Sequence, residues 1–374
     1  MEEKIREFEE RLTRTQKNKA TQKAINYTKA QIAKLRNDLL KIASSKKGGG
    51  SGFGVKKTGD AQVAFIGFPS VGKSSLLNLL TRGNTNSKVA SYDFTTLQAI
   101  PGMMKIEDAQ IQLIDLPGII LGAAAGKGRG REIIAAARNA DLILILIAFQ
   151  YNGKIDFEHL FQIRKELYDA GIRLNQKPPR IQIKPRTRGG IGFTYNGKQI
   201  MDQDEVKALM NELGYSNAAV YFFEPNITAD QLIDHVLGNR KYISEFVVIN
   251  KSDLEQHEYT NEQISEIIGH NNWIKISALN NQHIDDLRHQ IFLQLHLIRV
   301  YLKPPGKEVD KDEPIILKEG DSIERLCIKL HKTFVQNYRY ALIWGPSAKH
   351  PGQKFNSMEH ILKDGDIVSI YLKR

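Results

Sequence analysis

The sequence predicts an α/β protein whose central domain is a doubly wound, mostly parallel sheet with helices on both faces. Strand-like and helix-like segments alternate from Ala61 onward, beginning with "AQVAFIGF" and "SSLLNLLT". The continuous apolar run from Leu142 to Phe149 is typical of a parallel strand that is covered on both faces. A glycine-rich turn joins the first strand to the first helix.

Other segments of the chain show different patterns. Ile5, Phe8 and Leu12 recur at helical spacing, which predicts an N-terminal helical element. About 70 residues separate the helix near Phe157 from the next strand, "EFVVIN", and this is too long for a loop in a compact domain. We therefore predict an inserted small α+β domain. The predicted boundaries are 1–47 for a basic helical region, 48–59 for a flexible linker, 60–170 and 241–300 for the two parts of the nucleotide-binding domain, 171–240 for the insert, and 301–374 for a small mixed domain.

The composition indicates a soluble protein of a reducing compartment. Of its 374 residues, 41% are hydrophobic and 25% are charged, as in ordinary globular proteins. The longest apolar run falls far short of the ~20 residues that span a membrane, and the charged N-terminus shows no secretory signal. The single cysteine, Cys327, excludes an internal disulfide. We therefore expect a cytoplasmic protein.

Basic residues are concentrated near the N-terminus. Thirteen Lys and Arg residues lie between Arg11 and Lys57, against one acid, Asp38, whereas the net charge of the whole chain is +11. A second basic cluster, from Arg173 to Arg188, also contains no acid. Such runs are typical of segments that bind an anionic polymer, so we expect RNA or the ribosome as a partner. A solvated helix face and a membrane surface are the alternatives.

The stretch "GFPSVGKS" matches the P-loop pattern between a strand and a helix. The two glycines let backbone N–H groups surround the phosphates, while the lysine contacts the β- and γ-phosphates and the final serine binds Mg²⁺. The positive end of the helix dipole adds to this site. The predicted phosphate-binding residues are Gly67, Phe68, Pro69, Ser70, Val71, Gly72, Lys73 and Ser74.

Two further stretches have the form of switch loops that sense the γ-phosphate. In "DFTTL", Thr96 is expected to bind Mg²⁺ through its hydroxyl and the γ-phosphate through its N–H. In "DLPG", Asp115 would hold the Mg²⁺ shell, and the N–H of Gly118 would contact the γ-phosphate. We assign Mg²⁺ to Ser74 and Thr96.

The stretch "NKSD" at the end of a buried strand is expected to select guanine. The Asp253 carboxylate can accept hydrogen bonds from the N1–H and the amino group of guanine, which adenine cannot supply. Lys251 can lie along the base plane, and a backbone N–H in "SAL" can meet guanine O6. The predicted base-binding residues are Asn250, Lys251, Asp253, Ser277, Ala278 and Leu279.

Together these motifs resemble the developmentally regulated GTP-binding protein (DRG) family of the Obg-like GTPase group. The resemblance extends over essentially the whole chain, from "TRTQKNKAT" through "GKGRGREIIAAAR" to "YALIWGPSAKH". It implies a P-loop GTPase domain, an N-terminal helical element, an insert, and a C-terminal TGS domain of ubiquitin-like β-grasp form. It also implies hydrolysis of GTP, association with translating ribosomes, and a partner of the DRG-family-regulatory type.

The sequence does not reveal which group positions the hydrolytic water. Many related switches carry glutamine after D-x-x-G, but here the residue is Ile119, which cannot form a side-chain hydrogen bond. We assign catalytic contacts to Lys73, Thr96 and Gly118, and we expect a slow intrinsic rate. Some relatives use K⁺, held partly by a loop asparagine, but this loop has Ser70 instead. K⁺ is therefore an open alternative, as are Arg129 and Arg131.

Two other functions remain as alternatives. A nucleotide-binding scaffold with negligible turnover is compatible with Ile119, and an RNA-binding structural module is compatible with the basic segments. Use of ATP is disfavoured by Asp253, whose two acceptor bonds suit guanine. A sequence-specific DNA regulator is disfavoured too, since no recognition helix is apparent.

Overall fold

The computed structural model describes residues 1–16, 18, 20–45, 57–81, 101–116, 130–257 and 259–373. The chain divides into two compact units. The first combines residues 1–52 with 171–242, and the second combines residues 53–170 with 243–374. Most of the predicted linker at 48–59 lies outside the described residues, as do all of "DFTTL" and the last two residues of "DLPG".

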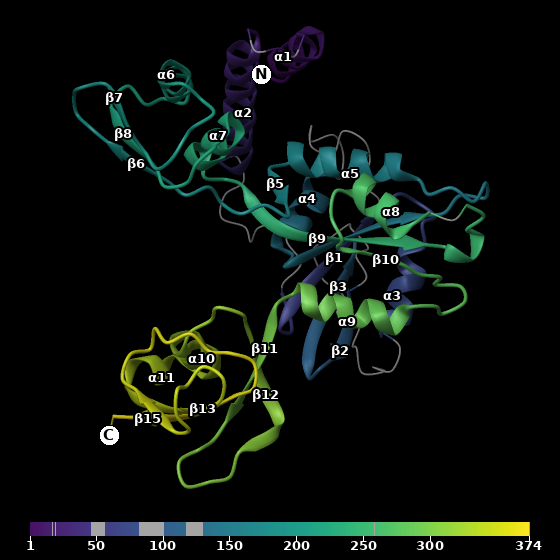
Figure 1. The fold of residues 1–374 in the computed structure, drawn as a ribbon, viewed down its shortest axis with the longest axis vertical. Coiled ribbons are helices and arrows are strands. Elements are labelled where there is room, and N and C mark those ends of the chain that lie inside the picture. The colour runs from purple at the N-terminus through teal and green to yellow at the C-terminus, as the bar shows by residue number, and fades with distance from the viewer. Residues whose placement is uncertain are drawn as a thin grey trace. The chain divides into compact units, whose positions relative to one another are not determined.

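The second unit contains the doubly wound sheet (Figure 1). Its strands lie in the order β10-β9-β4-β1-β3-β2. All neighbours on the path are parallel except β2 and β3. The strands of this path are β1 (Ala61–Gly67), β2 (Pro101–Ile106), β3 (Ala109–Asp115), β4 (Leu142–Ala148), β9 (Lys241–Asn250) and β10 (Trp273–Lys275). The predicted fold class is confirmed for this domain.

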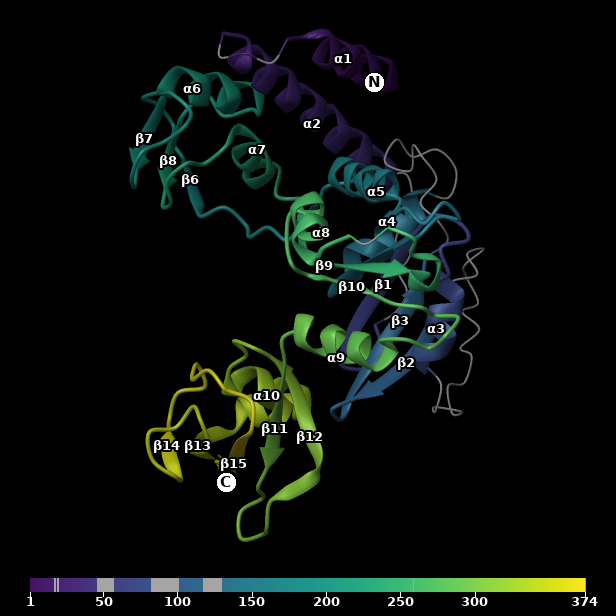
Figure 2. The ribbon, with the colours of Figure 1, turned by 45° about the vertical axis from the view of Figure 1, so that its right-hand side comes forward.

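Helices cover both faces of this sheet, as Figures 1 and 2 show. One face carries α4, α5 and α8, and the other carries α3 and α9. The helices are α3 (Lys73–Thr81), α4 (Gly130–Asn139), α5 (Phe157–Asp169), α8 (Asn261–Ile268) and α9 (Ile284–Gln294), with a short 3-10 turn η1 at Ser252–Leu254. Every residue of β4 is buried, which explains its uninterrupted apolar sequence.

The same unit also contains a small mixed sheet near the C-terminus. Its strand order is β12-β11-β15-β13-β14, and β11 and β15 form its parallel pair. Cys327 on α10 is completely buried in the core of this part, and burial raises the pKa of its thiol to about 11. The elements are β11 (Leu297–Leu302), β12 (Asp310–Lys318), α10 (Ile323–Leu330), α11 (Lys332–Gln336), β13 (Tyr338–Trp344), β14 (Gln353–Phe355) and β15 (Asp366–Leu372).

The first unit joins the N-terminal helices to the insert. A three-stranded sheet in the order β6-β8-β7 packs against α6 and α7, and α2 packs against these two helices (Figures 1 and 2). Ala30 of α2 is fully buried in the core that they share. The elements are α1 (Glu2–Arg14), α2 (Gln22–Ser45), β5 (Ile172–Leu174), β6 (Ile181–Pro185), β7 (Ile191–Tyr195), α6 (Gln203–Glu212), β8 (Ala218–Phe222) and α7 (Ala229–Leu237).

Ion pairs between α2 and the insert engage several of the N-terminal lysines. Lys23 binds Asp202 at 2.6 Å, and Lys29 binds Asp230 at 2.8 Å. The Nζ of Lys34 donates to the backbone carbonyl of Glu212 at 2.7 Å. Part of the basic character of this segment therefore faces acids of its own unit.

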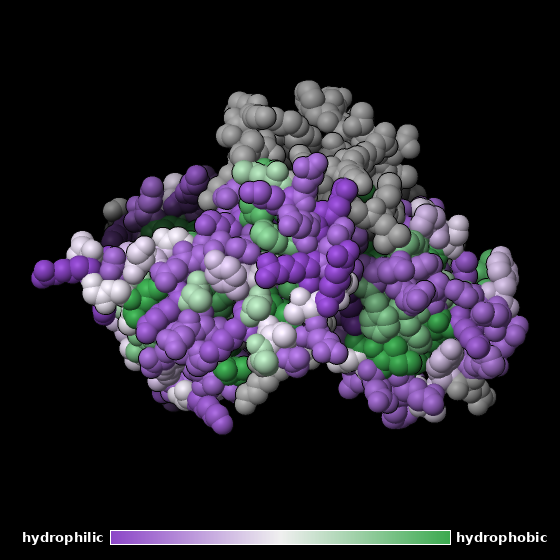
Figure 3. Space-filling view, turned by 90° about the horizontal axis from the view of Figure 1, so that it is seen from above, coloured by the Kyte–Doolittle hydropathy of each residue, from purple (hydrophilic) through white to green (hydrophobic). Residues whose placement is uncertain are grey.

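The surface seen in Figure 3 is mostly hydrophilic, and its apolar residues gather in separate patches. No helix in the described part of the chain is both long and apolar enough to cross a membrane.

Candidate nucleotide-binding site

The predicted phosphate loop connects the buried strand β1 to helix α3. Its backbone requires glycine at both ends of the turn. Gly72 has a φ of 95°, and a Cβ there would lie 2.3 Å from the side-chain nitrogen of Asn250. A Cβ on Gly67 would lie 2.6 Å from the carbonyl oxygen of Leu146. The loop can therefore pack this closely on neighbouring strands only because both residues lack a side chain.

Lys73 lies at the start of α3 and is only 9% exposed. Its Nζ donates hydrogen bonds to the carbonyl oxygens of Gly67 and Phe68, both at 2.9 Å. Burial lowers the pKa of this ammonium group, and the nearby Asp115 carboxylate partly opposes that shift. A bound phosphate would supply the opposite charge that this buried cation lacks.

Ser74 and Asp115 meet at the carboxyl ends of β1 and β3. The Ser74 hydroxyl donates to Asp115 Oδ2 at 2.7 Å. The other carboxylate oxygen, Asp115 Oδ1, is buried and has no hydrogen-bond partner among the described residues. A buried carboxylate oxygen without a donor suits a hydrated cation, and hydroxyl and carboxylate oxygens are ligands that Mg²⁺ accepts. These two residues therefore fit the magnesium ion that the motif implies.

Asn250 connects the predicted base-binding residues to the phosphate loop. It is 2% exposed at the end of β9. Its Nδ2 donates to the carbonyl of Val71 at 2.8 Å, and its Oδ1 accepts from the N–H of Ala278 at 3.0 Å. The buried Ser277 hydroxyl donates to Asp253 Oδ1. Three motifs that are far apart in the sequence therefore meet at one edge of the sheet, as expected where parallel strands end.

The remaining predicted site residues fall into two groups. Lys251 follows β9 with a φ of 61°, in the left-handed region, and Leu279 is 84% exposed on the loop after β10. Thr96 and Gly118 lie outside the described residues, together with Ile119 and Arg129. Arg131 lies in the first turn of α4, but its side chain is not described.

An aromatic contact beside the phosphate loop could not be predicted from the sequence. Phe68 stacks on His159 of α5, with ring centroids 3.9 Å apart and planes 16° apart. The contact packs the loop against a helix that begins almost ninety residues later. No local pattern indicates it, because it depends on how α5 packs on the sheet.

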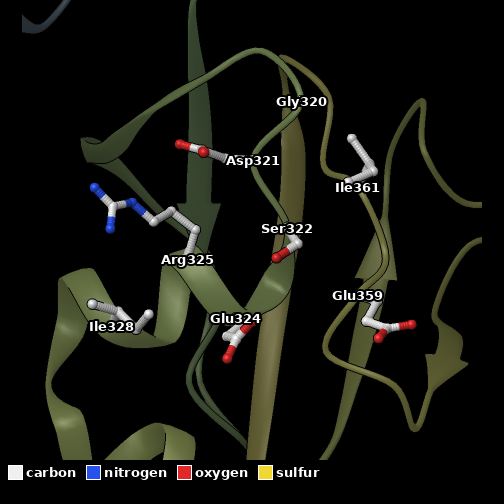
Figure 4. Close-up of a pocket in the computed structure, with 8 residues that line it drawn as sticks. All are labelled: Gly320, Asp321, Ser322, Glu324, Arg325, Ile328, Glu359 and Ile361. Carbon is white, nitrogen blue, oxygen red and sulfur yellow. The ribbon is translucent and has the colours of Figure 1, made fainter. Parts of the chain in front are cut away.

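A separate pocket lies in the C-terminal part of the second unit (Figure 4). Its volume is about 360 Å³, and it contains none of the nucleotide motifs. Its charged lining residues are Asp321, Glu324, Arg325 and Glu359. The backbone N–H of Lys318 donates to the Asp321 carboxylate, and the N–H of Leu362 donates to the Asp321 carbonyl. The pocket therefore lies at a turn that these hydrogen bonds hold in place.

Comparison with known proteins assigns the chain to a family. A family model described as a 50S ribosome-binding GTPase matches residues 62–184, the model of that domain's C-terminal region matches 188–297, and a TGS domain model matches 298–372. A Dictyostelium discoideum developmentally-regulated GTP-binding protein 1 homolog is 44% identical, with 99% of each chain covered. The chain belongs to the developmentally regulated GTP-binding protein family.

Two further relatives have similar sequence identity to this chain. An uncharacterized GTP-binding protein of Methanocaldococcus jannaschii is 47% identical, covering 100% of this chain and 93% of that protein. Developmentally-regulated GTP-binding protein 1 of Xenopus laevis is 42% identical, covering 99% of this chain and 98% of that protein. Among solved structures, the Schizosaccharomyces pombe YchF GTPase is 13% identical with a TM-score of 0.48, covering 84% of this chain and 99% of that one. The resemblance inferred from the motifs is confirmed, and the chain is a GTP-binding protein of the Obg-like group.

Proposed function

We propose that this protein hydrolyses GTP to GDP and phosphate at the phosphate loop. The supporting observation is the arrangement of Lys73, Ser74 and Asp115: a buried cation beside a hydroxyl–carboxylate pair with an unpartnered buried oxygen. Mg²⁺ would be held at Ser74 and Thr96, with Asp115 in its shell, and would offset phosphate charge. Lys73 would contact the β- and γ-phosphates, and the backbone N–H groups of the loop would surround them.

We assign guanine recognition to the residues that Asn250 connects to the loop. The carboxylate of Asp253, oriented by Ser277, would accept hydrogen bonds from the guanine edge. The backbone from Ser277 to Leu279 would meet O6, and Lys251 would lie along the base.

For the hydrolytic step, the catalytic contacts assigned to this chain are those of Lys73, Thr96 and Gly118. Ile119 has no group that can orient water, so the intrinsic rate is expected to be slow. An added cation or partner would then supply the missing transition-state contact. Arginines supplied by partners are worth about 10³ to 10⁵ in rate elsewhere. K⁺ is one candidate, and the exposed Ser70, with a φ of 65°, lies in the loop that would face it.

The proposed cellular role is a cytoplasmic switch on translating ribosomes or their RNA, working with a regulatory protein partner. The family assignment and the matching GTPase model support this role, as does the sequence pI of about 9.4. Polycations bind RNA through its phosphates, largely independently of base sequence.

Single-turnover hydrolysis of GTP by the full chain tests the proposal. We expect slow release of phosphate in Na⁺ and Mg²⁺, and faster release when K⁺ or ribosomes are added. The control is a Lys73→Ala variant, which should not respond to either addition. Binding of GTP without hydrolysis under all of these conditions would instead establish a nucleotide-binding scaffold.

A further inference from the structure

The three-stranded sheet of the first unit has one face without a covering helix. Its inner face packs on α6 and α7, whereas the described residues of this unit place no helix on the outer face (Figures 1 and 2). Side chains on a strand alternate between the two faces. Ala218, Val220 and Phe222 of β8 belong to the core, so Tyr221 and the following Phe223 point outward.

The neighbouring strand β6 adds basic residues to the same outer face. Ile181 and Ile183 point to the core, so Gln182 and Lys184 point outward. Arg180 and Arg186 flank the strand and continue this alternation. All four of these side chains are exposed. We call the surface formed by Arg180, Gln182, Lys184, Arg186, Tyr221 and Phe223 the outer sheet face.

The register places the basic and aromatic side chains next to one another. Arg180 is bonded to Phe223 through their backbones, since the N–H of Phe223 donates to the Arg180 carbonyl at 2.9 Å. The Nζ of Lys184 lies 5.4 Å from the centroid of the Tyr221 ring. A Cβ on Gly192 of β7 would lie 3.4 Å from Arg186 Nη1, so this guanidinium extends across the sheet.

The two aromatic rings form a flat, accessible pair. Tyr221 and Phe223 are nearly parallel, with planes 13° apart and centroids separated by 6.5 Å. Phe223 is 44% exposed, which is unusual for so apolar a side chain. Exposed aromatic rings on a small sheet are the means by which several domains stack on unpaired bases.

The charges of the outer sheet face are not matched by acids of the described part of this unit. No side-chain ion pair of Arg180, Lys184 or Arg186 with a described residue is found, and Thr194, which pairs with Tyr221 on β7, is uncharged. The acid at the edge of this face is Glu224, whose carboxylate accepts a hydrogen bond from the backbone N–H of Arg180 at 2.9 Å. Other basic residues of the unit differ. Arg173, the first of the basic cluster, is buried and bound to Asp234 at 2.6 Å, so it does not contribute to this surface.

We propose that the outer sheet face binds unpaired nucleotides of RNA. Tyr221 and Phe223 would stack on bases, while Arg180, Lys184 and Arg186 would contact the phosphates. The proposal rests on the RNA role proposed above and assigns it to a surface remote in sequence from the nucleotide motifs. Bases and phosphates alternate closely along a single strand, which matches the adjacency of rings and cations here. In paired RNA the faces of the bases are stacked inside the helix, so a duplex would contact the basic side chains but not the aromatic rings.

Fluorescence anisotropy of the full chain with a labelled 12-nucleotide single-stranded RNA tests the proposal, with the same sequence as a duplex for comparison. We expect Tyr221→Ala/Phe223→Ala to weaken single-strand binding by about tenfold or more, since base stacking is worth about 1–3 kcal/mol per base. Duplex binding should change little. The ring-retaining variant Tyr221→Phe should bind the single strand like the parent.

The dependence of RNA binding on salt distinguishes the contribution of the aromatic rings from that of the basic side chains. The triple variant Arg180→Ala/Lys184→Ala/Arg186→Ala should reduce the log–log salt slope for the single strand by about 2, because each lost phosphate contact removes about 0.7. The ring variant should keep the parental slope. A matched aromatic control is Tyr151→Ala, whose ring is 89% exposed on the other unit, and a matched charge control is Lys207→Ala on α6.

The outcomes distinguish this proposal from the proposed function. If the parent binds RNA and the ring variant binds equally well, the outer sheet face is not a base-stacking surface, although the RNA role stands. If the parent binds neither form of RNA, the RNA role fails as well. Circular dichroism and GDP binding of each variant must match the parent, and Tyr221→Phe provides a ring-retaining comparison where the alanine variant loses structure.

Discussion

The side-chain amide of Asn250 holds the phosphate loop by donating a hydrogen bond to the carbonyl of Val71 at 2.8 Å. The same amide accepts a hydrogen bond from the N–H of Ala278. One buried side chain thus connects the residues proposed to bind phosphate with those proposed to bind the base. The absence of a Cβ on Gly72 allows this contact, because such an atom would lie 2.3 Å from the amide nitrogen.

The Asn250→Asp variant should weaken both parts of the site. A carboxylate oxygen would replace the amide donor and face the Val71 carbonyl, leaving two acceptors opposed in a buried position. We expect a stability loss of about 1–3 kcal/mol and a loss of affinity for both GDP and GTP. Thermal melting and nucleotide titration measure the two effects. Asn280→Asp, on the exposed loop nearby, is the control, and equal losses in both variants would contradict the assigned role.

Base selectivity should depend on Asp253. In the Asp253→Asn variant we expect weaker binding of GTP and improved binding of xanthosine triphosphate, whose carbonyl replaces the guanine amino group. The loss of two charge-assisted hydrogen bonds should cost GTP roughly 2–5 kcal/mol. Competition titrations with both nucleotides measure this change in nucleotide preference. Unchanged affinity for GTP would exclude Asp253 as the residue that reads the base.

The first unit should unfold when α2 is separated from the insert. Ala30 is completely buried between them, so Ala30→Asp places an unpaired charge in their core and should destabilise this unit by about 3 kcal/mol or more. We expect faster proteolysis within residues 171–242 and nearly unchanged GDP binding. Lys29→Ala, which removes only a half-exposed ion pair, should change stability by less than about 1 kcal/mol. Resistance of the insert to proteolysis in Ala30→Asp would show that α2 is not needed for its fold.

Acid should weaken the second unit through Glu245. Burial alone would raise the pKa of this carboxyl, but hydrogen bonds from His270 and Arg164 outweigh burial and hold its pKa below the usual value of 4.5. The stability that ionised Glu245 contributes is therefore complete above pH 4.5, and it is lost as the pH falls through the lower pKa of Glu245 in the folded state. The Glu245→Gln variant should lose about 3 kcal/mol at pH 7 because Arg164 is left without its partner.

Melting curves between pH 3 and 7 test the role of Glu245. The difference in stability between the parent and Glu245→Gln should be present at pH 7 and should shrink as the pH falls below about 4.5. A difference that stays constant over the whole range would mean that the charge of Glu245 does not cause the stabilisation.

Much of the fold of the nucleotide-binding domain could be predicted because its signals are local. The run from Leu142 to Phe149 forms β4 and ends in a bridge, and the phosphate loop lies between β1 and α3 as its glycines indicate. The convergence of Asp115 and Asn250 follows from the parallel strands that carry them. The stacking of Phe68 on His159 could not be predicted, since it depends on tertiary packing.

The partners of the basic residues were harder to predict, because the sequence shows which residues are charged but not which groups lie next to them in the fold. The charge of the N-terminal cluster predicts binding to an anionic polymer, yet Lys23 and Lys29 bind acids of the insert. Arg173 belongs by sequence to the basic cluster of the insert but lies buried against Asp234. Helical spacing near the N-terminus predicts helices with an apolar face, but spacing does not identify the partner of that face.

The joining of α2 to the insert has a consequence for synthesis of the chain. The N-terminal helix emerges from the ribosome long before its binding surface exists, because α7 ends roughly 190 residues after α2. At typical elongation rates of about 5–20 residues per second, this delay lasts about 10–40 s. During this time the nucleotide-binding strands β1 to β4 are made, while the side of α2 that packs on α6 and α7 has no partner yet. Newly made chains therefore expose that side of α2, and the first unit can close only after the insert has been translated.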